Sequence, residues 1–334
     1  MADAVAEWVS GWTGEQHVER RGESSGGPVV PRAVRVRVPA TSANLGPGFD
    51  ALGLALSRYD EHEFIRDPAG RPGSARVTVS GEGAGALACD DGNLVVTAAR
   101  ASAAWAGRAL PPFVLHCTNR IPHGLGLGSS AAAIVAGVIG GRTLSGLPRD
   151  EGAELVAAAR LEGHPDNVAP AILGGFTIAW VDSAAAGPIT ARAARLEPSG
   201  FRVLAYLPTT AVSTAAARGL LPAVVPHGDA AHAAGRSALL VLALTGRADL
   251  LLPATEDRLH TQARGVAMPE SLAMIEQLRA QGIAAVLSGA GPGVLALVAD
   301  GKGEGITATG QLPAGWQRLE LSPDLVGAQC TAQP

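Results

Sequence analysis

A glycine-rich segment in the middle of the chain constrains the possible fold more than any other feature. Between Ile121 and Ala133, three glycines alternate with larger residues and two serines then begin an apolar stretch, which predicts a helix over Ser129–Leu144. Glycine permits positive φ and close approach of the backbone to a ligand, and N–H groups beside a helix N-terminus bind anions. The spacing therefore predicts a phosphate-binding loop ahead of a helix, although a tight turn with a serine cap would show the same spacing.

The near absence of lysine excludes several classes of phosphate-handling enzyme. Lys302 is the single lysine among the 26 basic residues, and its glycine-rich surroundings predict an exposed turn. Walker-A ATPases, protein kinases and pyridoxal-phosphate enzymes each need a lysine in a context that this chain lacks. A phosphate loop in this chain must therefore work through backbone N–H groups and hydroxyls.

Charge, apolar run length and cysteine use narrow the class of protein further. The 26 basic and 30 acidic residues give a net charge of −4, which argues against a nucleic-acid partner. The apolar stretches are shorter than the ~18–20 residues of a membrane span, and residues 1–30 do not resemble a secretory signal. The three cysteines show no C-x-x-C spacing, so neither a disulfide framework nor a zinc site is indicated. We therefore expect a cytoplasmic protein with no membrane partner.

The length of 334 residues favours two domains or one large one, and a hydrophobic content of 47% allows a sizeable core. Linker composition predicts a flexible N-terminal extension over 1–32, and the weakly periodic segment 188–199 separates a first domain, 33–190, from a second, 200–325. Interleaved helices and strands predict an α+β fold. The expected strands are 34–38, 51–56, 75–80, 113–117, 176–181, 201–207, 283–287, 294–298 and, as the last, 316–321; the expected helices are 93–106, 129–144, 149–161, 214–221, 230–245 and 270–280.

Three other segments carry clusters of chemically capable residues. The turn Pro39–Asp50 follows a strand and contains Asn44, Asp50 and two glycines. The segment Ser288–Gly293 predicts a second glycine turn between strands. Between them, six consecutive positions hold four polar side chains ahead of an apolar run: Glu162, His164, Asp166 and Asn167.

Taken in order, the three glycine segments resemble the signature motifs of the GHMP small-molecule kinases, which include galactokinase, homoserine kinase and mevalonate kinase. The stretch Val36–Leu56 and the stretch Glu162–Pro170 are similar to the homoserine kinase form. The resemblance extends from about Val34 to the last expected strand. It implies a two-domain fold, with an N-terminal α/β nucleotide-binding domain and a C-terminal α+β domain that contains an antiparallel sheet.

The resemblance also implies ATP and Mg²⁺ as cofactors. In the family the middle glycine loop wraps the ATP phosphates, and Mg²⁺ is held by a serine and an acidic residue, matched here by Ser130 and Glu162. Mg²⁺ prefers oxygen ligands and commonly takes one or two from the protein. The residues matched to ATP are Asn93 near the adenine and, in the loop, Pro122, His123, Gly124, Leu125, Gly126, Leu127, Gly128, Ser129, Ser130 and Ala131.

For the second substrate, the resemblance implies L-homoserine, which would receive the γ-phosphoryl group on its hydroxyl to give O-phospho-L-homoserine in threonine biosynthesis. Its carboxylate would be held by two arginines, matched by Arg218 and Arg264, because a planar guanidinium suits bidentate binding. The matched substrate-binding residues are Asn44, Asp50, His164, Asn167, Thr214, Arg218 and Arg264. The matched catalytic residues are Ser130, Glu162, Asp166 and Asn167, with Asn167 orienting the hydroxyl and the proton leaving to phosphate or water.

Two other functions fit the same motifs. One is a GHMP kinase for another small alcohol, such as mevalonate or shikimate. The other is a non-catalytic nucleotide-binding sensor, against which the retention of Ser130 and Glu162 argues. The family usually has a hydroxyl residue where this chain has Gly293, so we expect a looser third turn. A homodimer is expected from the resemblance.

Overall fold

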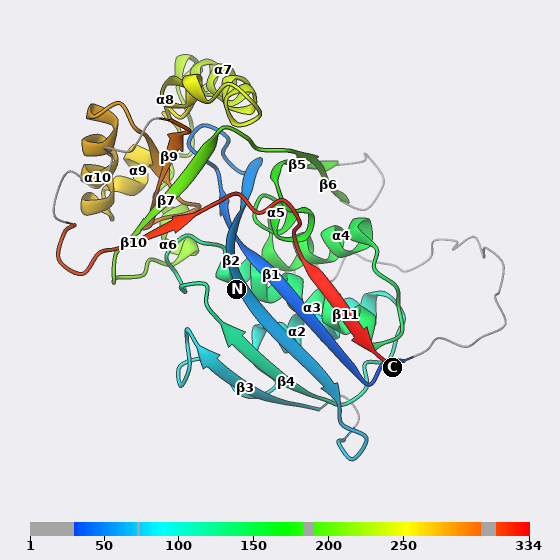
Figure 1. Ribbon diagram of the computed structural model, residues 1–334. Helices are drawn as coiled ribbons and strands as arrows, with labels where there is room; N and C mark the ends of the chain where they lie inside the picture. Colours follow the sequence, from blue (N-terminus) through cyan, green and yellow to red (C-terminus); the bar gives the residue numbers. More distant parts are fainter. Residues whose placement is uncertain (1–29, 72–73, 183–189, 302–311) are drawn as a thin grey trace.

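Two β-sheets organise the chain in the computed structural model, which describes residues 30–71, 74–182, 190–301 and 312–334. Most of the expected N-terminal extension and the expected turn at Lys302 lie outside the described residues. The larger sheet occupies the lower part of Figure 1 and the smaller sheet the upper left. A continuous apolar cluster joins the two sheets, with Val36 and Leu54 in the first and Val203 and Leu297 in the second.

The larger sheet is built around two long antiparallel strands, β1 (Ala33–Ala43) and β2 (Leu52–Arg66). Its strand order is β11-β1-β2-β4-β3. Strand β5 pairs with the first three residues of β2, Leu52–Leu54, and β6 pairs with β5. Only β3 and β4 pair in parallel within the described part of this sheet. The remaining bounds are β3 (Ala75–Gly81), β4 (Phe113–Asn119), β5 (Phe176–Asp182), β6 (Thr190–Leu196) and β11 (Gln329–Gln333).

Helices α2 (Leu94–Trp105), α3 (Ser129–Leu144), α4 (Glu151–Glu162) and α5 (Val168–Leu173) cover one face of this sheet (Figure 1). Helix α3 is apolar on nearly every side and lies in the core. A Cβ at Gly140 would lie 2.2 Å from the Phe64 ring, and a Cβ at Gly141 would lie 2.4 Å from Ala99 O. Glycine therefore lets α3 pack closely on both β2 and α2, which fixes the helix that begins at the glycine loop.

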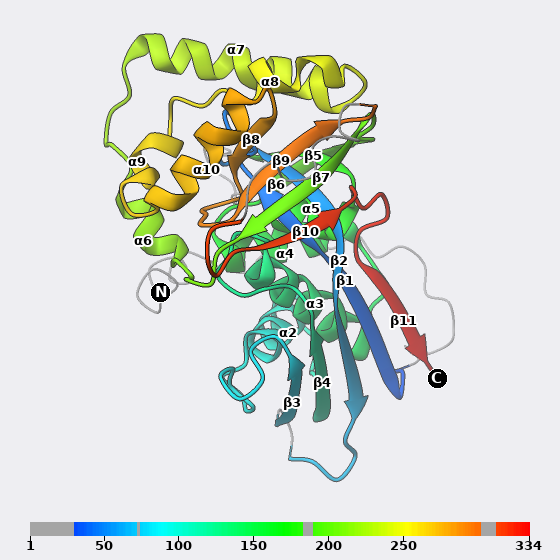
Figure 2. The same ribbon diagram turned by 60° about the vertical axis from the view of Figure 1, so that its left-hand side comes forward.

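The smaller sheet is wholly antiparallel, in the order β10-β7-β9-β8. Figure 2 shows α7, α8 and α10 along one side of it. Its strands are β7 (Phe201–Leu207), β8 (Ala284–Leu287), β9 (Val294–Ala299) and β10 (Gln317–Leu321). Its helices are α6 (Thr214–Gly219), α7 (His227–Leu244), α8 (Leu251–Ala254), α9 (Thr261–Gly265) and α10 (Pro269–Ala280), with a 3-10 turn over Ala248–Leu250.

The α+β class and the antiparallel second sheet are confirmed. Three details of the expected strands are wrong. The segment taken as a boundary contains β6, β2 is much longer than expected, and the chain continues past β10 into β11, which returns to pair with β1. The domain bounds 33–190 and 200–325 stay a prediction. Within the described part of the chain, no helix combines the length and apolar character that a bilayer crossing needs.

Candidate active site

The glycine loop adopts a backbone that only glycine supports without strain. Gly124, Gly126 and Gly128 have φ values of 69°, 81° and 69°. A Cβ at Gly126 would lie 2.2 Å from Ser288 O, and one at Gly128 would lie 2.0 Å from Thr41 Oγ1. The N-cap of α3 is Gly128, so no side chain caps this helix. The alternative of a serine-capped turn is therefore wrong. The first helical residues are the two serines, whose hydroxyls do not cap the helix.

The three glycine segments, far apart in sequence, meet around this loop. Thr41 N donates a hydrogen bond to Leu127 O (3.1 Å), which ties the end of β1 to the loop. From the third segment, Ser288 Oγ lies 2.5 Å from Gly126 O and 2.9 Å from Ser42 Oγ. A Cβ at Gly293 would lie 2.3 Å from Leu125 O. The expectation of a looser third turn is therefore wrong, because glycine at this position allows tight packing against the loop.

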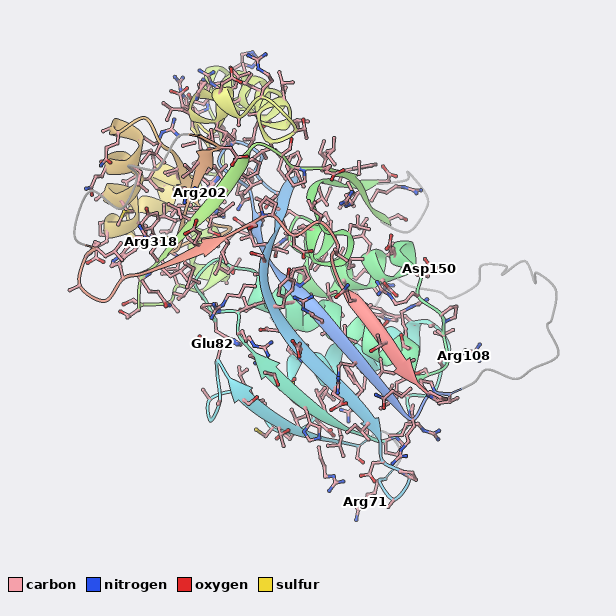
Figure 3. All side chains as sticks on the ribbon, viewed as in Figure 1. Arg71, Glu82, Arg108, Asp150, Arg202 and Arg318 are labelled. Carbon is pink, nitrogen blue, oxygen red and sulfur yellow. The ribbon has the colours of Figure 1, made fainter. Side chains whose placement is uncertain are left out.

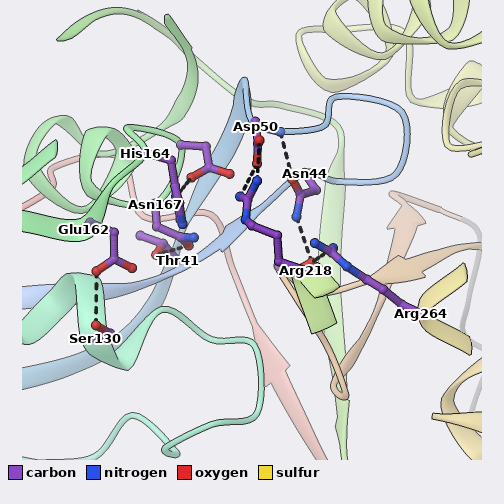
Figure 4. Close-up of polar contacts among 11 residues, drawn as sticks. Thr41, Asn44, Asp50, Ser130, Glu162, His164, Asn167, Arg218 and Arg264 are labelled. Atoms are coloured by element: carbon purple, nitrogen blue, oxygen red, sulfur yellow. Dashed lines mark hydrogen bonds and ion pairs between the residues drawn. The ribbon is translucent and has the colours of Figure 1, made fainter. Parts of the chain in front are cut away.

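A cavity of about 120 Å³ opens where the segments meet, between the two sheets. Figure 4 shows Ser130 and Glu162 at one side, Asp50 and Arg218 at the other, and Asn167 between them. The expected site residues that line the cavity are Asn44, Asp50, Gly124, Gly126, Gly128, Ser129, Ser130, Glu162, His164, Asp166, Asn167, Thr214, Arg218 and Arg264.

On the phosphate side, Ser130 Oγ donates a 3.1 Å hydrogen bond to Glu162 Oε2. The second residue of α3 and the last residue of α4 are thus brought together (Figure 4). Burial raises the pKa of Glu162 above its usual value. No larger group of His, Cys, Asp and Glu side chains gathers for metal binding anywhere in the described ranges. A carboxylate beside one hydroxyl matches the sparse protein ligation that Mg²⁺ uses when phosphates and water complete its shell.

Beside this pair, His164 Nδ1 lies 2.5 Å from Asp166 Oδ1. Burial alone would lower the pKa of His164, but the contact with Asp166 and the nearby carboxylates Glu162 and Asp50 raise it overall. Asn167 Oδ1 accepts a 2.9 Å hydrogen bond from Thr41 Oγ1. The Nδ2 group of Asn167 is therefore the end of that amide suited to meeting a ligand in the cavity.

The turn after β1 holds Asp50 in an uncommon backbone conformation. Asn44 and Asp50 have positive φ values of 67° and 54°, a region that Asn and Asp tolerate better than other side chains. Asn44 Nδ2 donates to Gly289 O (2.8 Å), and Asp50 N donates to Asn44 Oδ1 (3.0 Å). The Asn44 side chain thus positions Asp50 and joins the first glycine segment to the third. A direct contact between Asn44 and a substrate stays a prediction.

Two arginines from the second half of the chain reach the same side of the cavity. Arg218 donates to both oxygens of Asp50, at 2.7 and 3.0 Å, in a partly exposed bidentate pair. Arg264 is almost fully buried, and its Nη1 donates to Gly289 O at 3.1 Å. Burial lowers the pKa of Arg264, and the charge of Arg218 lowers it further. Both guanidinium groups lie within 6 Å of the Phe49 ring, at 5.7 and 5.3 Å.

Some positioning residues were missed in the sequence. His260 Nδ1 lies 3.2 Å from Arg264 Nη1, and its Nε2 lies 2.9 Å from Gly46 O. Burial lowers the pKa of His260, so the neutral ring accepts from Arg264 and donates to Gly46. The spacing of four residues between His260 and Arg264 was the available signal, because such residues share a helix face. Phe49 and Thr41 adjoin recognised motif residues but carry no distinguishing pattern.

Other expected ATP residues lie outside the cavity lining. Asn93 caps α2: its Oδ1 accepts from Val95 N (3.0 Å) and its Nδ2 donates to Ala88 O (2.8 Å). Both ends of this side chain are used within the fold. Pro122, His123, Leu125, Leu127 and Ala131 are also absent from that lining, and the last three are buried. Any contact that these residues make with ATP stays a prediction.

Comparison with known proteins gives the family. Models of the GHMP kinases N terminal domain and the GHMP kinases C terminal domain match residues 93–175 and 238–308. A homoserine kinase from Streptomyces avermitilis is 50% identical over 300 residues, which cover 89% of this chain and 95% of that protein. The chain belongs to the homoserine kinases. Membership in this GHMP kinase family confirms the resemblance and the assignment as a kinase enzyme.

Further homoserine kinases agree with this assignment. One from Streptomyces coelicolor is 54% identical over 269 residues, covering 79% of this chain and 84% of that protein. The crystal structure of homoserine kinase from Cytophaga hutchinsonii matches with a TM-score of 0.73 over 94% of this chain and 100% of that chain. At 24% identity, that structure supports the fold alone.

Proposed function

We propose that this homoserine kinase transfers the γ-phosphoryl group of ATP to the side-chain hydroxyl of L-homoserine, giving O-phospho-L-homoserine in threonine biosynthesis. One observation carries the proposal. A single cavity is lined by the N-terminus of α3 with Ser130 and Glu162 on one side and by Asp50, Arg218 and Arg264 on the other. Phosphoryl transfer depends on alignment and charge neutralisation, so a donor site and an acceptor site within one cavity meet its main requirement.

The acceptor side has the charge pattern of an amino-acid site. Arg218 and Asp50 form an ion pair in the structure. In a complex with an amino acid, Arg218 suits the carboxylate and Asp50 suits the ammonium group. An exposed ion pair contributes only about 0.2–1 kcal/mol, so exchanging it for contacts to a bound amino acid costs little. Arg264, held by Gly289 O and His260, offers a second guanidinium for the carboxylate. Mevalonate, galactose and shikimate have no ammonium group for Asp50.

The donor side fits a nucleotide phosphate with Mg²⁺. Gly126 and Gly128 leave no room for a Cβ, which keeps the loop backbone tight against its neighbours and its N–H groups close to the cavity. The helix N-terminus adds partial positive charge there. Ser130 and Glu162 would hold Mg²⁺, which when bound neutralises charge that develops on the phosphates. Glu162 is half-buried and its pKa is raised by burial, so a bound cation would stabilise its charged form.

For the acceptor hydroxyl, we assign Asn167 the orienting role through its Nδ2 group, with Thr41 holding the amide from the other end. Asp166 is already engaged by His164, whose raised pKa favours the charged pair. Asp166 therefore acts mainly by shaping charge in the cavity. The hydroxyl proton leaves to phosphate or water, as expected from the sequence.

The test is the initial rate of ADP release with ATP, Mg²⁺ and each of L-homoserine, mevalonate, galactose and shikimate. We expect kcat/KM for L-homoserine to exceed every other value by at least 100-fold. Comparable turnover of another alcohol would replace the substrate, and ATP binding without turnover of any of the four would favour a nucleotide sensor. We also propose a cytoplasmic location and a homodimeric state, and sedimentation equilibrium of the purified chain tests the homodimer.

A further inference from the structure

A second cavity in the structure is separate from the active site. It has a volume of about 600 Å³ and lies between the C-terminal ends of α2 and α3, the outer side of α4, and β6. Small-molecule sites commonly measure about 300–1,000 Å³ and combine an apolar lining with a few polar groups. Here the apolar lining includes Leu155, Val156, Leu173 and Ala193.

The charged groups that line this cavity are mainly cationic. Three arginines, Arg142, Arg160 and Arg192, accompany one carboxylate, that of Glu151. Arg192 pairs with Asp182 at 2.8 Å. Arg142 and Arg160 form no ion pair with any carboxylate in the described ranges, and Arg160 lies 4.4 Å from the centre of the Trp105 ring. Two guanidinium groups without acidic partners thus face one apolar cavity.

Two buried polar atoms at this cavity also lack partners among the described residues. Ser102 is 1% exposed and its Oγ makes no hydrogen bond, and Arg142 Nε is buried without an acceptor. Both residues belong to the cavity lining. A buried donor without an acceptor is unfavourable, so native proteins commonly satisfy such atoms with water or a ligand. The residues that carry these two donors therefore line the same cavity as the two guanidinium groups without acidic partners.

We propose that this cavity is a second binding site, for a small oxyanion carried on a short aliphatic body. A carboxylate and a phosphate each offer neighbouring oxygens that can accept two hydrogen bonds from one guanidinium group. In this proposal the aliphatic part lies against Leu155, Val156 and Leu173, and the oxyanion meets Arg142 and Arg160.

The site is linked to the active site through two shared helices. Helix α4 carries Arg160 at the cavity and Glu162 at the active site, and residues two apart face opposite sides of a helix. Helix α3 carries Ser130 at one end and Arg142 about 18 Å further along its axis. The second site and the Ser130–Glu162 pair are therefore built on the same two helices.

Calorimetric titration of the full chain with hexanoate, hexyl phosphate, hexanol and hexylammonium tests the proposal. We expect one of the two anions, or both, to bind at least tenfold more tightly than hexanol, and hexylammonium to bind no better than hexanol. The two anionic probes also distinguish a carboxylate site from a phosphate site. Equal binding of anionic and neutral probes would overturn the assignment.

Variants locate the binding. Arg142→Gln and Arg160→Gln should each weaken anion binding about tenfold or more, whereas Arg71→Gln, on the distant loop at the bottom of Figure 3, should not. Ala193→Leu fills the cavity without removing a charge, so it should also weaken binding and guards against a misfolded arginine variant. Arg218→Ala should leave this binding intact. Loss of anion binding in Arg218→Ala with none in the cavity variants would assign the anion to the active site and overturn the proposal.

Discussion

Replacing Arg218 by alanine should damage homoserine recognition while leaving the fold intact. Its bidentate contact with Asp50 is partly exposed, with side-chain exposures of 43% and 36%, so its loss should change the free energy of unfolding by at most about 1 kcal/mol. A charge-assisted hydrogen bond to the substrate carboxylate is worth about 1.5–3 kcal/mol. Because about 1.4 kcal/mol is a factor of ten, kcat/KM for L-homoserine should fall roughly 10–100-fold.

Arg264→Ala should produce the same kinetic loss together with a loss of stability. Arg264 is 1% exposed, and its removal leaves His260 Nδ1 and Gly289 O without this donor. Gly289 O keeps its hydrogen bond from Asn44 Nδ2, whereas His260 Nδ1 is left unpaired. A buried group left unpaired costs about 1–3 kcal/mol, so the midpoint of urea denaturation should fall. The two alanine variants should therefore differ in their effect on protein stability, although both arginines bind the same substrate carboxylate.

The assay measures kcat/KM for L-homoserine and KM for ATP in both alanine variants, in the matching lysine variants and in Arg71→Ala as an exposed control. KM for ATP should change little, and lysine should restore only part of the activity because an ammonium cannot reproduce the planar fork. Equal loss for both substrates in Arg218→Ala would indicate a folding defect. No loss for homoserine would refute the carboxylate role and transfer it to Arg258, which pairs with Asp229 on the surface.

Three further predictions concern the metal site, pH and the chain terminus. Glu162→Gln should lower kcat by about 100-fold or more at saturating Mg²⁺, whereas exposed Glu276→Gln should not; near-normal turnover of the first variant would contradict the metal role. Burial lowers the pKa of His62 from 6.5 to about 4, so the unfolded chain takes up its proton first and the free energy of unfolding should decrease by about 3 kcal/mol as pH falls from above 6.5 to 4. His62→Leu should flatten that decrease, and an unchanged pH profile from urea denaturation would show that other groups cause it. A chain that begins at Pro31 should keep its melting temperature and activity, and a large loss of either would assign residues 1–30 a structural role.

Local pattern was sufficient for elements that the core defines. Helix α3 occupies Ser129–Leu144 as expected. Its apolar residues and the glycine before it are adjacent in sequence, so the local pattern contains the whole signal. The missed strands β6 and β11 contain one large aliphatic residue between them, Leu196, and their pairing partners decide their conformation. The chain brings β11 to β1 from nearly 300 residues away, with Val36 opposite Cys330. Such a contact leaves no periodic signal in either segment.

The same division applies to the candidate site. The resemblance to the family motifs identified Ser130 and Glu162, which the structure brings within hydrogen-bond distance. The pairing of Arg218 with Asp50 joins residues 168 positions apart, and the supporting contact of Arg264 with His260 depends on burial between the two sheets. Tertiary packing creates both contacts. The sequence could therefore indicate which residues belong to the site, but not which side chains hold those residues in position.

The most direct test of a shared donor and acceptor cavity is ³¹P NMR of the reaction of this chain with ATP, Mg²⁺ and L-homoserine. We predict that the γ-phosphate signal of ATP declines as one new phosphomonoester signal grows, and that proton–phosphorus correlation joins this signal to the side-chain methylene next to the homoserine hydroxyl. Omitting homoserine should stop the decline. Release of inorganic phosphate alone, or a phosphorus signal unconnected to homoserine protons, would contradict phosphoryl transfer between two ligands bound in this cavity.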